Sequence, residues 1–172
     1  AADRRWTLWH IARCLMHLQR YDELLTMLER LCRLFGNQRA YQLLKASAYE
    51  RTQKTEEARA IYSAILLDSP DDIETLRRLS RNLLLDSQKH AALEYARMAA
   101  DNEKSTREDK LKLAWLLLLC GNVTEAYQTF KSITNDTKEL LSLFDADAAA
   151  LPKEVIDIPQ TSLQLFRDSL SL

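Results

Sequence analysis

An internal repeat of 34 residues constrains the fold of this chain more than any other feature of its sequence. Ala58, Ala92 and Ala126 are each 34 positions apart, and similar residues surround each of them. A fixed period of this length indicates one structural unit repeated along the chain. Extending the frame back by one period places Leu24 at the same phase. The frame divides residues 1–138 into four units, about 5–38, 39–72, 73–106 and 107–138.

Glycine and proline are too scarce in this sequence for a β fold. The chain has 172 residues, of which only 2 are Gly and 3 are Pro. A sandwich or barrel needs a turn about every 8–12 residues, and those turns favour Gly, Pro, Asn or Asp. The repeated units are therefore predicted to be helical. The expected helices lie near 5–19, 22–35, 38–52, 56–68, 72–86, 88–102, 106–120 and 123–134.

Several polar residues mark the expected starts of these helices. Thr55 and Ser87 each precede a predicted helix, as N-cap residues do. Ser105 and Glu108 have the spacing of a capping box, in which the two side chains satisfy free backbone N–H groups. These signals agree with the frame of the repeat.

The repeated unit resembles that of the tetratricopeptide repeat family, a helix-turn-helix of 34 residues. The family prefers small residues at the eighth and twentieth positions, because two helices approach closely there. The eighth positions in this chain are Ala12, Ala46, Ser80 and Ala114, and the twentieth are Leu24, Ala58, Ala92 and Ala126. The resemblance implies an all-α fold, a right-handed α-solenoid of such helix pairs.

The residues after the fourth unit are expected to close this stack. A capping helix is predicted over residues 139–150, because a solenoid must cover its open end. Residues 151–172 are predicted to form an extended tail and a short terminal helix, with Leu163, Phe166 and Leu170 on one face. We expect this tail to fold back along the groove or against the last helix pair. A tail that only caps the stack is the alternative.

Composition argues against several other functions. The 24 basic and 25 acidic residues give a net charge of −1, which gives no reason to expect binding to nucleic acid. Gly36 and Gly121 stand alone, so no phosphate-binding loop is present. The longest apolar run, residues 113–120, is too short for membrane insertion. Three cysteines without CxxC spacing favour a reducing, cytoplasmic compartment, and no cofactor is expected.

One cluster of residues suggests a metal site. His10, Cys14 and His17 have the spacing that places side chains on one face of a helix, where they and a fourth ligand would hold zinc. No partner cluster appears elsewhere in the sequence, so we interpret them as ordinary helical residues. No loop that would stabilise an oxyanion is evident either. The chain is therefore predicted to have no metal and no catalytic activity.

The resemblance also implies a binding surface. In tetratricopeptide proteins the first helix of each unit lines a concave groove, mainly through its second, fifth, ninth, twelfth and thirteenth positions. Trp and Arg are the residues most enriched at binding hot spots. The residues expected to contact a partner are Trp6, Trp9, Arg13, Met16, Leu43, Arg51, Arg77, Arg81, Leu111, Trp115 and Leu118. The Lys, Asn and Arg clamp of some family members is absent, because Trp9 and Arg13 replace its first two residues.

These features predict a non-catalytic adaptor or chaperone that binds a segment of another protein in an apolar groove. One alternative is a chaperone of the type III secretion kind, which resembles this chain in its length and helical repeats. Another is a structural fragment of a larger complex, in which Trp6 and Trp9 pair with another copy as a homodimer or pack under a further element. A separate interpretation of the groove residues is structural, with Trp6 and Trp9 packed under an N-terminal element and Leu118 in the core between repeats.

Overall fold

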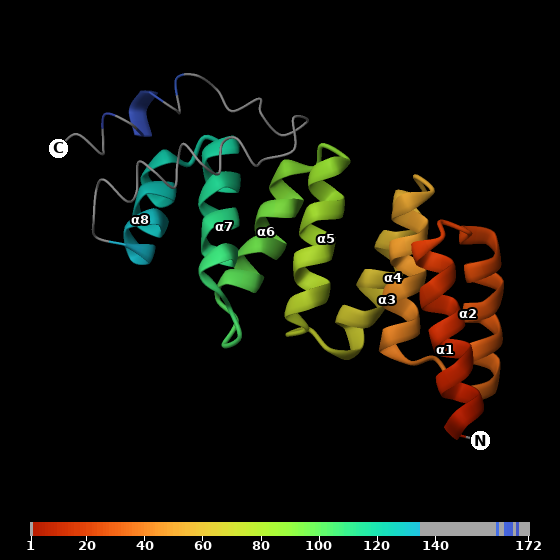
Figure 1. Ribbon diagram of the computed structural model, residues 1–172. Helices are drawn as coiled ribbons and strands as arrows, with labels where there is room; N and C mark the ends of the chain where they lie inside the picture. The colour runs from red at the N-terminus through yellow and green to blue at the C-terminus, as the bar shows by residue number, and fades with distance from the viewer. Residues whose placement is uncertain (1, 135–160, 162–163, 167, 169–172) are drawn as a thin grey trace. The chain divides into compact units, whose positions relative to one another are not determined.

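The computed structural model describes residues 2–134, 161, 164–166 and 168, which are helical apart from short turns (Figure 1). The all-α fold class is thereby confirmed. The capping helix expected over 139–150 and the extended part of the tail lie outside the described residues. The helices within the described residues are α1 (Ala2–His17), α2 (Tyr21–Phe35), α3 (Arg39–Arg51), α4 (Thr55–Asp68), α5 (Ile73–Leu85), α6 (Lys89–Ala100), α7 (Arg107–Leu119) and α8 (Val123–Ile133).

The chain divides into two compact units, one ending at Pro70 and the other beginning at Asp71. The first contains α1 to α4 and the second α5 to α8. Within each unit, consecutive helices pack against each other as pairs, and the pairs pack against one another through α2 and α3 or through α6 and α7. Among the described residues, no helix is both long enough and apolar enough to span a bilayer.

The turn inside each helix pair has the same backbone conformation in all four units. Gln19, Gln53, Ser87 and Gly121 occupy the same position of the 34-residue frame, and their φ angles are 58°, 60°, 60° and 81°. A positive φ favours glycine, because other L-residues clash with the following carbonyl. Only the fourth unit has glycine there, so glycine content alone does not reveal this turn.

Small residues bring the helices of each pair together, as the repeat frame predicts. Ala12 in the first repeat and Ala46 in the second are fully buried. In the third repeat, the Ser80 hydroxyl on α5 donates a hydrogen bond of 2.8 Å to the carbonyl of Ala92 on α6, which joins the eighth and twentieth positions of that repeat. This contact shows how closely the two helices approach.

The core of the first compact unit, residues 1–70, forms where α1, α2 and α3 meet. Its buried members are Leu8, Ala12, Leu15, Leu24, Leu28, Leu31, Tyr41 and Ala48. Leu24 replaces the usual alanine of the twentieth position and is nevertheless fully buried. The space beside α1 therefore accommodates a larger side chain than the family pattern requires.

Two of the expected helix caps are wrong by one residue. The N-cap residues of α4 and α6 are Lys54 and Gln88, rather than Thr55 and Ser87. In each turn the residue with positive φ, Gln53 or Ser87, stands immediately before the N-cap. The cap of α4 therefore lies one residue earlier than expected, and that of α6 one residue later.

The capping box of α7 is also displaced by one residue from its expected place. It is formed by Thr106 and Asp109, rather than by Ser105 and Glu108. Asp109 is in addition the acceptor for Arg77 of α5. The pairing with Arg77 is a tertiary contact that local sequence does not reveal.

Candidate binding surface

The fifth position of one unit contacts the third position of the next in both halves of the chain. In the first, the ring of Trp9 lies 5.4 Å from that of Tyr41, centroid to centroid. In the second, the guanidinium of Arg77 binds the carboxylate of Asp109. The same spatial relation is therefore filled by two aromatic rings in one place and by an ion pair in the other. Trp9 and Arg77 therefore make contacts between neighbouring repeats.

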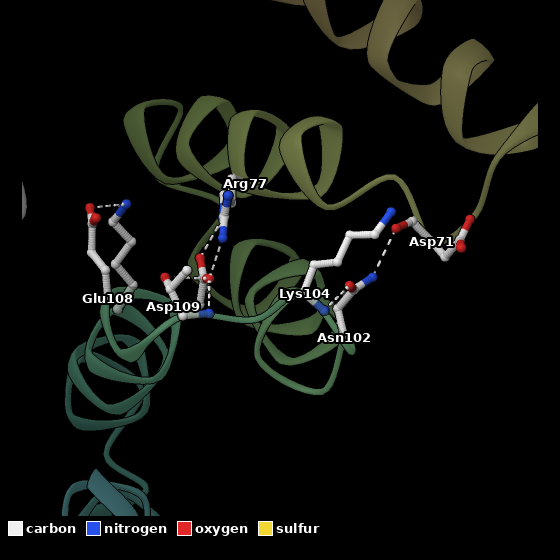
Figure 2. A network of polar contacts seen from close by, with 8 residues as sticks. Asp71, Arg77, Asn102, Lys104, Glu108 and Asp109 are labelled. Carbon is white, nitrogen blue, oxygen red and sulfur yellow. Dashed lines mark hydrogen bonds and ion pairs between the residues drawn. The ribbon is translucent and has the colours of Figure 1, made fainter.

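The Arg77–Asp109 pair joins α5 to α7 through two parallel hydrogen bonds (Figure 2). Arg77 Nε lies 2.6 Å from Asp109 Oδ1, and Arg77 Nη2 lies 2.5 Å from Oδ2. The backbone N–H and the hydroxyl of Thr106 also donate to Oδ2, at 2.8 and 2.9 Å. The carboxylate is almost fully buried, with four donors around it, so it is held in one orientation.

Burial by itself raises the pKa of the Asp109 carboxyl, because removal from water disfavours the charged form. The hydrogen bonds from Arg77 and Thr106 oppose that effect and outweigh it, so the pKa of Asp109 lies below its ordinary value. The hydrogen bond to Asp109 likewise raises the pKa of Arg77. Both groups are charged at neutral pH.

A second ion pair joins α6 to α8 beside a polar cleft. Arg97 donates to both carboxylate oxygens of Glu125, with Nη2 2.8 Å from Oε2. This bond lowers the pKa of Glu125 and raises that of Arg97. The cleft has a volume of about 390 Å³ and is also lined by Lys110, Leu113 and Gln128. The third and fourth repeats are thus tied together on both helix layers.

The exposed surface of α1 carries the most accessible aromatic side chain among the predicted site residues. Trp6 is 65% exposed, and its ring lies 4.1 Å from that of His10, centroid to centroid. Arg13 and His17, at helical spacing from Trp6, are exposed as well. Met16 is half-buried against the core beside them. The side chains of Leu8, Ala12 and Leu15 on the opposite face are buried.

The other predicted site residues differ widely in exposure. Leu43, Trp115 and Leu118 are buried, and the ring of Trp115 meets Phe130 edge to face, with 5.9 Å between the centroids. Their side chains therefore belong to the cores of their units in this structure. Arg51 and Arg81 are exposed, whereas Leu111 is half-buried.

Sequence reasoning overlooked two exposed apolar side chains. Leu67 is 84% exposed on α4, and Met98 is also exposed, on α6. The helical periodicity gave no signal for them, because the frame assigns Leu67 and Met98 to second helices, which were not expected to line the groove.

One described part of the tail packs against the last helix pair. Phe166 is fully buried, although its neighbour Leu165 is exposed. Its ring lies 5.1 Å from that of Phe130 and 6.4 Å from that of Tyr127, centroid to centroid. Leu163 and Leu170 lie outside the described residues. Phe166 thus docks on α8, which is one of the two places where the tail was expected.

The cysteines and histidines do not assemble into a metal site within the described residues. No group of three or more His, Cys, Asp or Glu side chains there is arranged to hold a metal ion. Cys14, Cys32 and Cys120 are free thiols. Burial raises the pKa of the Cys120 thiol, so that group is a poor nucleophile at neutral pH.

Comparisons with known proteins agree with the repeat frame. Residues 40–72 match the family model of the tetratricopeptide repeat, almost the same span as the second unit of the frame. No curated protein matches the sequence significantly. The chain has the fold of tetratricopeptide repeat proteins, and its resemblance to that family is confirmed.

Several solved structures share this fold at low sequence identity. MamA from Desulfovibrio magneticus is 16% identical, with a TM-score of 0.63, over 75% of this chain and 73% of that one. YrrB, described as a tetratricopeptide protein with an unusual peptide-binding site, is 15% identical, with a TM-score of 0.64, over 94% and 87%. A tetratricopeptide repeat protein from Parabacteroides merdae is 17% identical, with a TM-score of 0.67, over 97% and 64%.

Proposed function

We propose that this chain is a non-catalytic adaptor or chaperone that binds a segment of another protein through the exposed surface of α1. The residues of this surface are Arg5, Trp6, Trp9, His10, Arg13, Met16 and His17, and it is called the α1 surface below. The fold supports the proposal, since tetratricopeptide repeats generally serve as protein-interaction scaffolds. The peptide-binding site named for YrrB is consistent with it.

The exposure of Trp6 is the observation that carries this proposal. A tryptophan that is 65% exposed leaves a large apolar area in water, although its ring already contacts His10. When a partner covers that area, each Å² removed from water contributes about 25 cal/mol of favourable free energy. Tryptophan and arginine are also the residues that most often dominate interface energies. Trp6 and Arg13 therefore combine an apolar anchor with a charged donor on one helix surface.

The free thiols also bear on where the protein works. Three cysteines without a disulfide are typical of proteins in a reducing compartment. A cytoplasmic location is accordingly part of the proposal.

Affinity capture with matched variants tests the function. The immobilised full chain is compared with Trp6→Ala and with Leu34→Ala, a control that removes an exposed apolar side chain from α2 of the same unit. Proteins captured by the wild type and by Leu34→Ala should be lost with Trp6→Ala. For a purified partner, Trp6→Ala should cost roughly 2 kcal/mol, about thirtyfold in affinity.

The proposal fails if Trp6→Ala and Leu34→Ala capture the same proteins with unchanged affinity. In that case the partner docks elsewhere on the chain. Circular dichroism melts of the two variants accompany the experiment, because a folded Trp6→Ala protein makes its binding loss interpretable.

A further inference from the structure

The α1 surface lies in a part of the chain with a local excess of positive charge. Residues 4–21, which lie between Asp3 and Asp22, contain Arg4, Arg5, Arg13 and Arg20 but no Asp or Glu. Elsewhere acidic residues are frequent, since 25 of 172 residues are Asp or Glu. The whole chain has a net charge of −1, so the excess of positive charge on α1 is local.

Most of these arginines form no ion pair with an acidic side chain in the part of the chain that the structure describes. Arg20 pairs with Glu23 at 2.5 Å, but Arg4, Arg5 and Arg13 are exposed and form no ion pair with any described residue. On α5 and α7, by contrast, Arg78 pairs with Glu74 and Lys112 pairs with Glu108. The cations of α1 are therefore available to a partner's carboxylates.

The cations and the aromatic rings occupy adjacent rows of the same helix. Arg5, Trp9 and Arg13 follow one another at i, i+4 spacing, which places them along one ridge. Trp6 and His10 form the next ridge, with their rings in contact. A segment lying along α1 would thus meet an apolar anchor point flanked by guanidinium groups. Guanidinium groups bind carboxylates through paired hydrogen bonds.

Resting on the function proposed above, we infer that the α1 surface selects an acidic protein segment that carries at least one large apolar residue. The apolar residue covers Trp6, and Asp or Glu side chains on either side bind Arg5 and Arg13. Complementary charge of this kind mainly increases the association rate and the selectivity for the partner. Basic segments are rejected, because like charges approach one another across the interface.

Two other ligand classes fit the surface less well. Nucleic-acid binding normally needs a basic domain, whereas this chain is slightly acidic overall. Insertion into a membrane needs an accessible apolar helix face, and the apolar face of α1, with Leu8, Ala12 and Leu15, is buried in the core. An acidic protein segment needs only the side chains that α1 exposes.

Selection from a random dodecapeptide library displayed on phage tests this inference with the full chain. The selected peptides should contain more Asp and Glu than Lys and Arg, and each should include a large apolar residue. The variant Arg5→Glu/Arg13→Glu should bind such a peptide at least tenfold more weakly and with a weaker dependence on salt. The control Arg30→Glu/Arg33→Glu makes the same charge change on exposed residues of α2 and should stay within twofold of the wild type.

Three results would overturn the inference. The first is a selection that yields no peptides, or peptides without an excess of acidic residues. The second is an equal effect of the two charge-reversal variants, with both proteins folded by circular dichroism. The third is saturable binding of the oligonucleotide dT12, lost in both Trp6→Ala and Arg5→Glu/Arg13→Glu, which would assign the surface to nucleic acid.

The Trp6→Ala variant separates this inference from the proposed function. Peptides that require Trp6 but show no acidic preference would contradict only the inference. Acidic peptides that bind equally well without Trp6 would contradict the proposed function and the apolar contact with Trp6, and only the preference for acidic residues would stand.

Discussion

The substitution Arg77→Met removes the cation that balances the buried carboxylate of Asp109 and keeps much of the apolar stem. The Asp109 side chain is 2% exposed, so its charge stays away from water when its partner is lost. Breaking a buried ion pair from one side typically costs about 3–5 kcal/mol. Because Arg77 itself is 32% exposed, water reaches the vacated position and the pair is partly screened. We therefore expect a cost at or somewhat below the lower end of this range, about 2–3 kcal/mol.

A neighbouring residue provides the control for this substitution. Arg78 pairs with Glu74 four residues earlier on α5, and both side chains are more than a third exposed. Exposed pairs of this kind contribute about 0.3–0.5 kcal/mol, so Arg78→Met should have little effect. Urea denaturation followed by circular dichroism measures both variants. Equal losses of stability would show that the Arg77–Asp109 pair does not stabilise the second compact unit, and the reasoning would be refuted.

The effect of Arg77→Met should also depend on pH. The pKa of Asp109 is lower in the folded protein than the ordinary value of 3.8. Its contribution to stability is therefore present above about pH 4 and is lost as the pH falls through the folded-state pKa. Without Arg77, burial raises the pKa of Asp109, so the variant is relieved by protonation at a higher pH than the wild type. The difference in unfolding free energy between the two should shrink as the pH falls towards 3.

Two further predictions concern packing. Ala92→Leu should overpack the crossing of α5 and α6 and cost roughly 1–3 kcal/mol, because Ala92 is fully buried; the exposed Glu94 gives the control Glu94→Leu, and equal melting temperatures would show that the 34-residue frame is misplaced. Phe166→Ala should lower the melting temperature and increase amide exchange in α8, because the ring packs on Phe130. Leu165→Ala, at an exposed neighbour, should change neither, and similar results for both would contradict the docking of Phe166.

Most of the fold follows from the sequence, because the repeat fixes both helix phase and helix pairing. The 34-residue frame places Ala46, Ala92 and Ala126 in the buried crossings where the structure has them. The sequence does not reveal the left-handed turn residues, since Gln53 and Ser87 have no local preference for a positive φ. Tertiary structure imposes that conformation on them.

The candidate site is less predictable, as the ninth position of the four units illustrates. Arg13 and Arg81 are exposed there, Ser47 is half-buried and Trp115 is buried. The repeat specifies the direction in which each side chain points from its helix. It does not specify what other residues lie in that direction, and Trp115 meets Phe130. Exposure at equivalent positions therefore requires the structure.

The contact between the fifth and third positions explains where binding energy is available. Trp9 lies against Tyr41, and Arg77 is held by Asp109, so a partner must share these side chains with an existing contact or break it. Breaking the Arg77–Asp109 pair would leave the buried carboxylate of Asp109 without its cation, which is costly. An acidic group of a partner that bound Arg77 instead would also face the negative charge of Asp109, so it could not offset that cost. Trp6 and Arg13 have no such obligation to a neighbouring repeat. On the proposed function, a partner should therefore gain most affinity at Trp6 and Arg13, and substitutions there should reduce binding with little loss of stability.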